Sequence, residues 1–141
     1  MKKALLACVL ASVAGMATAD VVAPAGADLP AKIRNLTAHT VEVEVVKPAE
    51  LRTPWDEIAA SMAGCRIEGA RSPSTDGRMS LKFGTLICPG KPSVAIEAFG
   101  VSSVHRRVDL DRTATVGTPL AVLVLANISL PGSKPWTNAV R

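Results

Sequence analysis

Residues 65–88 read CRIEGARSPSTDGRMSLKFGTLIC and hold the only two cysteines that lie beyond the first twenty residues. The segments on either side of the polar centre have the composition of strands, and Asp76-Gly77 supplies the positive φ that a hairpin turn needs. Two antiparallel strands at 65–70 and 78–88 are therefore predicted. Their pairing would bring the two cysteines together at the open end of the hairpin.

The N-terminus has the pattern of a secretory signal peptide at residues 1–19. Lys2 and Lys3 precede an apolar stretch that ends in Ala17-Thr18-Ala19, a small-x-small cleavage pattern. A membrane anchor would need about 20 apolar residues, and this stretch is shorter. We expect export to the periplasm and loss of Cys8 with the leader. Processing would leave 14 basic side chains against 12 acidic ones, a net charge of +2 instead of the +4 of the whole chain.

Export makes a disulfide between Cys65 and Cys88 the expected state of the two thiols. A zinc site would need four ligands, and neither a Cys-x-x-Cys nor a His-x-x-x-His pattern accompanies them. Redox-active pairs are spaced two residues apart, unlike this pair. No metal or cofactor is therefore predicted.

The remaining pattern predicts a mainly β fold, a small antiparallel barrel or sandwich with one short helix and one disulfide. Thr53 as N-cap, Pro54 and a stop at Gly64 mark the helix. We expect an extended N-terminal arm at 20–30, a β-rich domain at 31–130 and a flexible tail at 131–141. Besides the hairpin, the predicted strands are 31–36, 40–47, 93–99, 101–110 and 120–130, with a bulge or break at Gly100.

The sequence contains few residues that could support catalysis or nucleic-acid binding. His39 and His105 are isolated, and His105 and Asp109 would lie about 13 Å apart along a strand. Asp109 and Asp111 are expected to be solvated. The modest charge and the four aromatic residues do not fit a nucleic-acid surface. A protein without enzymatic activity is predicted.

Three segments resemble the TraB/TrbI family of scaffold proteins, which link the inner and outer membranes in conjugative type IV secretion machines. They are TPWDEIAASMAGCRIEG at 53–69, RMSLKFGTLIC at 78–88 and the stretch 96–100, within a resemblance that covers about residues 51–100. The matching positions are Cys65, Ile67, Arg78, Thr85, Leu86, Cys88 and Gly100. Family members also carry an uncleaved membrane helix, a proline-rich linker and a pore helix. Here a cleavable leader is predicted in place of the membrane helix, and no pore helix is expected.

The resemblance implies a detached periplasmic domain that helps to build a conjugative secretion apparatus at its outer-membrane core complex. Its partners would be other secretion proteins, or copies of itself in a homo-oligomeric ring, and it would reach the outer membrane only through them. Trp55, Arg106, Arg107 and Trp136 are the candidate partner contacts, although a solvated strand edge also explains the two arginines. The alternative is a free-standing periplasmic binding module or inhibitor that uses a sheet edge or the turn at 72–77.

Overall fold

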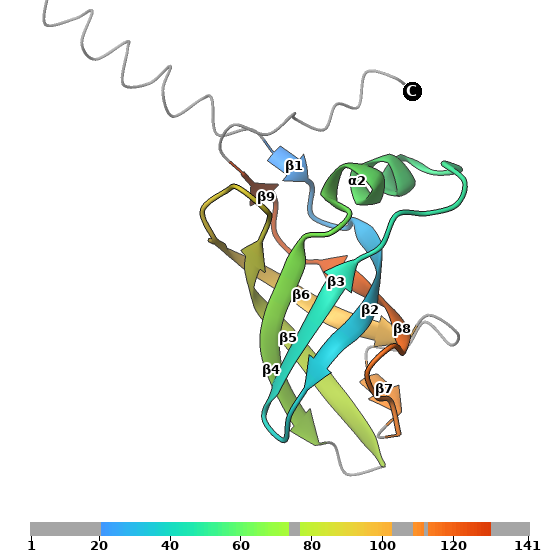
Figure 1. Cartoon of the computed structure of the whole chain (residues 1–141), viewed down its shortest axis with the longest axis vertical. Coiled ribbons are helices and arrows are strands. Elements are labelled where there is room, and N and C mark those ends of the chain that lie inside the picture. Colours follow the sequence, from blue (N-terminus) through green and yellow to red (C-terminus); the bar gives the residue numbers. More distant parts are fainter. Residues whose placement is uncertain (1–20, 74–76, 103–108, 112, 131–141) are drawn as a thin grey trace, which may run out of the picture.

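The computed structural model describes residues 21–73, 77–102, 109–111 and 113–130. Within these ranges the chain forms strands and one helix, which Figure 1 shows in order along the chain. They are β1 (Val21–Ala23), β2 (Asp28–Leu36), β3 (Thr40–Val45), α2 (Pro54–Met62), β4 (Arg66–Pro73), β5 (Arg78–Ile87), β6 (Val94–Ser102), β7 (Asp109–Asp111), β8 (Pro119–Val124) and β9 (Ile128–Ser129).

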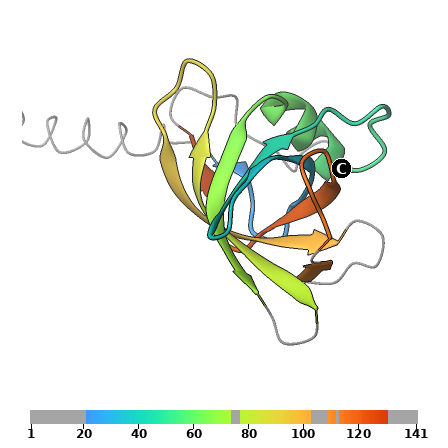
Figure 2. The same ribbon diagram turned by 60° about the horizontal axis from the view of Figure 1, so that its bottom comes forward.

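Six of the strands form a closed antiparallel barrel in the order β4-β3-β2-β8-β6-β5, and β5 pairs back with β4. Figure 2 shows the ring that this closure produces. The strand β7 pairs with the first residues of β5, and β1 pairs with β9 in a separate two-stranded ribbon. Of the two predicted architectures, the barrel is therefore the one that forms.

Alternation of apolar and polar side chains explains how the barrel fills its interior. In β3, Val41, Val43 and Val45 are buried while Glu42 and Glu44 lie on the outer face. Phe83 in β5 is 1% exposed. Every fully buried hydrophobic side chain helps to form one contiguous core, and none of the described buried residues is polar or charged. A half-buried strand is expected to alternate in this way.

The helix α2 lies at one end of the barrel and has the predicted start (Figure 1). The Thr53 side chain accepts a hydrogen bond from the Asp56 backbone N–H, and the Asp56 carboxylate accepts one from the Thr53 N–H. This capping box satisfies N–H groups that the first turn cannot. Ile58 and Met62 then bury one face of the helix against the core. None of the helices in the described ranges is long and apolar enough to span a membrane.

The N-terminal segment differs from the extended arm predicted for residues 20–30. Residues 21–23 form β1, and β2 already begins at Asp28. Val22, Ala23 and Leu29 are buried in the core. The segment has little periodicity because β1 is only three residues long. Its partner β9 lies at the other end of the described chain, so the pairing leaves no local pattern.

The predicted strand at 120–130 is divided in two. β8 ends at Val124, and Leu125 to Asn127 are exposed before β9 begins. The Asn127 side-chain oxygen accepts a hydrogen bond from the Ala25 N–H, which holds this turn beside the N-terminal segment. The chain therefore leaves the barrel wall and pairs with β1.

The glycine at position 100 neither bulges nor breaks its strand, so that expectation was wrong. β6 runs through Gly100, which pairs with Val122 of β8 in regular register. A Cβ at this position would lie 3.0 Å from Leu81 Cβ. Close packing against Leu81 of the neighbouring strand β5, and not a change in backbone direction, accounts for the glycine. Of the predicted strand at 101–110, residues 101–102 extend β6 and 109–110 belong to β7, and 103–108 lie outside the described residues.

Candidate functional site

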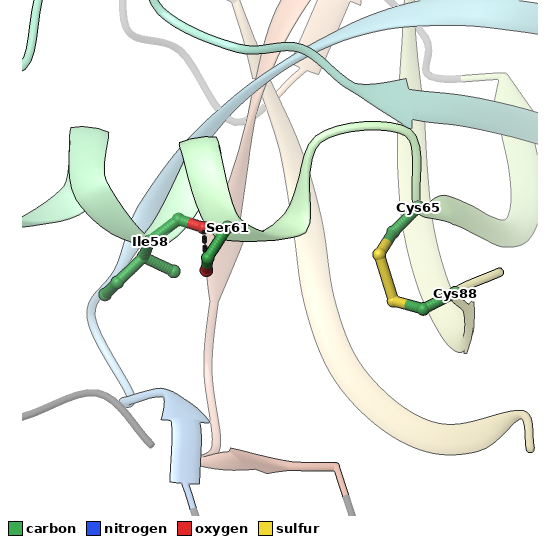
Figure 3. Close-up of a disulfide and its surroundings, with 4 residues drawn as sticks. All are labelled: Ile58, Ser61, Cys65 and Cys88. Carbon is green, nitrogen blue, oxygen red and sulfur yellow. Dashed lines mark hydrogen bonds between the residues drawn. A yellow bond between two sulfur atoms is a disulfide. The ribbon is translucent and has the colours of Figure 1, made fainter. Parts of the chain in front are cut away.

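The predicted disulfide joins Cys65 to Cys88 and fastens the open end of the β4–β5 hairpin (Figure 3). The neighbouring residues Arg66 and Ile87 are partners in the β4–β5 register, so the cysteines face each other across the strands with a Cα–Cα distance of 4.2 Å. Each cysteine is 5% exposed. The backbone N–H of Cys65 donates a hydrogen bond to the carbonyl oxygen of Met62. The disulfide therefore also anchors the end of α2.

The residues that carry the family resemblance lie along this hairpin, except Gly100 in β6, and they do not converge on one site. Ile67 of β4 and Leu86 of β5 are cross-strand partners, and both are fully buried. Thr85 is half-buried opposite Glu68, while Arg78 begins β5 at the other end of the strand. The buried members of the motif therefore have roles in packing.

The predicted partner contacts and titratable groups are scattered or lie outside the described residues. Trp55 is half-buried and packs on the core from α2. His39 is exposed, and its carbonyl oxygen accepts a hydrogen bond from the Arg71 N–H. The undescribed positions are His105, Arg106, Arg107 and Trp136, and for Asp109 and Asp111 only the backbone in β7 is described.

A groove of about 610 Å³ on the outer wall of the barrel is a feature that sequence reasoning missed. Its lining comes from the end of β2 and from β3, β4, β5 and β6. Gly69 and Gly84 contribute no side chains to its floor. Gly84 falls at a register shift with both neighbouring strands, where one strand has an extra residue. Such bulges bend strands locally, and we attribute the hollow to these bends together with the missing side chains.

The groove carries more negative than positive charge. Its lining includes Glu42, Glu68 and Glu97 and one cation, Lys82, which gives three negative charges against one positive and a net of −2. Glu42 is paired with Arg34 and Arg66, at 3.5 Å in each case. Among the described residues, the other three form no salt bridge.

The described lining contains carboxylates, an ammonium group, an amide and threonine hydroxyls. These groups can bind polar and cationic ligands by ion pairs and hydrogen bonds. The described residues contain no cluster of three or more His, Cys, Asp or Glu side chains that could hold a metal ion. The strand glycines Gly69 and Gly84 were the signal in the sequence that could have pointed to this hollow.

The chain matches no protein-family model. No curated protein matches it either.

Proposed function

We propose that this protein is an exported structural or assembly component of a conjugative type IV secretion apparatus, without enzymatic activity, associated with its outer-membrane core complex. The observation that carries this role is the disulfide between Cys65 and Cys88. It fastens the same hairpin on which the resemblance to the TraB/TrbI scaffolds rests. A stable disulfide is typical of a protein that works outside the cytoplasm.

The physical character of the barrel also supports a scaffold role. The interior is filled by apolar side chains, and the described buried residues offer no polar groups for chemistry there. Closure pairs each of the six strands with a neighbour on both sides over part of its length. A barrel closed in this way presents a stiff outer wall on which another protein can dock.

A free-standing binding module or inhibitor is the second candidate, and the open groove on the outer wall favours it as much as the scaffold role. Barrel closure, however, leaves less free strand edge for such a module than an open sheet would. The groove is the better candidate for its binding surface. The two functions differ in the size of the assembly that contains the protein.

The test is to isolate the tagged full chain from cell envelopes after mild cross-linking and detergent extraction. A structural component would elute in a large complex, and mass spectrometry would identify other secretion subunits in it. Deletion of the gene would also lower the frequency of conjugative DNA transfer. Elution of the protein alone, with unchanged transfer, would refute the proposed role and favour the binding module. In parallel, N-terminal sequencing of the exported protein should begin at Asp20.

A further inference from the structure

We infer that the outer groove binds an extended, basic segment of a partner protein. The inference deepens the proposed function, because it rests on the view that the protein works by binding other proteins. The groove crosses β3, β4, β5 and β6. Glu42 is already offset by Arg34 and Arg66. Glu68 and Glu97 against Lys82 then leave the described lining a charge of −1, opposite in sign to that of the whole chain. Charge complementarity of this kind orients a partner and excludes partners of the same sign.

The two unpaired carboxylates define the spacing of the basic residues. Glu68 lies on β4 and Glu97 on β6, with β5 between them. Neighbouring strands are about 4.8 Å apart, so these positions lie two strand spacings, or about 10 Å, from each other. Alternate residues of an extended peptide lie about 7 Å apart on one face. Two lysines or arginines at i and i+2 have side chains long enough to span the remaining distance of about 3 Å between these two spacings.

The floor of the groove gives room for the backbone of such a segment. Gly84 is exposed, and a Cβ added to it would meet no atom within 4 Å. Ala70 in the neighbouring strand is also exposed and small. A flat, extended peptide therefore has room for its backbone between the acidic side chains.

Other ligand classes fit the groove less well. A phosphate or a nucleic acid would be repelled by its net negative charge. Among the described lining residues Phe83 is the only aromatic one, and it is buried in the core at 1% exposure. The groove therefore offers no aromatic face on which a base could stack.

The direct test titrates the isotopically labelled chain with an octapeptide that alternates threonine and lysine, followed by NMR. We expect chemical-shift changes at the amides of Gly69 and Gly84, and weaker binding as salt is raised. A double variant, Glu68→Gln with Glu97→Gln, should bind about tenfold more weakly. Glu57→Gln is the matched control, because Glu57 is exposed on α2 and away from the groove, and it should change affinity by less than about twofold.

Two further variants act on the same groove by different means. Gly84→Leu would place a side chain across the floor and should abolish binding, since the space above Gly84 is empty and the change does not strain the backbone. Lys82→Gln removes the only cation among the described lining residues and should tighten binding about threefold. The dispersed spectrum of each variant reports that it has folded.

Shift changes confined to another face, or equal affinity of the double variant and the parent, would overturn the inference. Spermine serves as a control, because it is a small polycation without a peptide backbone. If spermine binds as tightly as the peptide, the groove does not select an extended peptide chain. If the peptide does not bind but the protein elutes in the secretion complex, peptide binding by the groove is refuted and the secretion role stands. If the peptide binds but the protein elutes without partners, the secretion role is refuted and peptide binding by the groove stands.

Discussion

Gly69→Ala should destabilise the barrel far more than the same change at Gly84, although both glycines line the outer groove. A Cβ at Gly69 would overlap the carbonyl oxygen of Lys82 and lie 2.7 Å from Phe83 Cα. Both obstacles are backbone atoms of the paired strand β5, so no side-chain rotation can relieve the overlap. The two strands would have to separate where they are held together by their own hydrogen bonds.

Overpacking of this kind costs about 3 kcal/mol, which corresponds to a fall of about 10–15 °C in Tm for a domain of this size. A Cβ at Gly84 meets no atom within 4 Å, and the backbone there is not in the left-handed region. Gly84→Ala should therefore raise stability by about 0.5 kcal/mol, because alanine reduces the entropy of the unfolded chain.

Urea denaturation followed by circular dichroism measures both changes, with Gly100→Ala as an intermediate case. The nearest atom at Gly100 is Leu81 Cβ at 3.0 Å. This overlap is much smaller than the one at Gly69, so a loss of about 1 kcal/mol is expected. Equal denaturation midpoints for the Gly69 and Gly84 variants would refute the account of the β4–β5 contact.

Three other changes test the remaining supports of the fold by the same denaturation assay. Replacing both Cys65 and Cys88 with alanine opens a loop closed over 23 positions and should cost about 3 kcal/mol; an unchanged midpoint would contradict a structural disulfide. Thr53→Ala removes the side-chain half of the capping box and should cost about 1 kcal/mol, with no loss expected for Thr53→Ser. Phe83→Ala empties a fully buried site and should cost about 3–5 kcal/mol; a loss below about 1 kcal/mol would mean that the core collapses around the site.

Local chemistry made some elements predictable from the sequence. The start of α2 depends on residues within a few positions of each other, namely Thr53, Pro54 and Asp56. The strand around Val41 to Val45 shows its buried face by alternation. The disulfide followed from the hairpin register and from the expected export. Each of these inferences needs only neighbouring residues or a single turn.

Contacts between distant segments explain the parts that sequence reasoning missed. β1 becomes a strand because β9 lies beside it, and Gly100 is small because Leu81 of the paired strand β5 packs against it. The groove depends on where strands of the closed barrel bend, so its acidic residues, such as Glu68 and Glu97, come together only after closure. No periodicity along a single segment encodes such a surface.

The place of β8 in the ring has a consequence for how the chain acquires its structure. β8 lies between β2 and β6, with Leu29 opposite Val122 and Ala98 opposite Val124. The ring can therefore shut only after β8 has been made, and until then β2 and β6 expose open backbone edges. Such high contact order slows folding and prolongs the interval in which the chain can aggregate. A chain that ends before Pro119 would lack the closing strand and should depend on a chaperone to stay soluble.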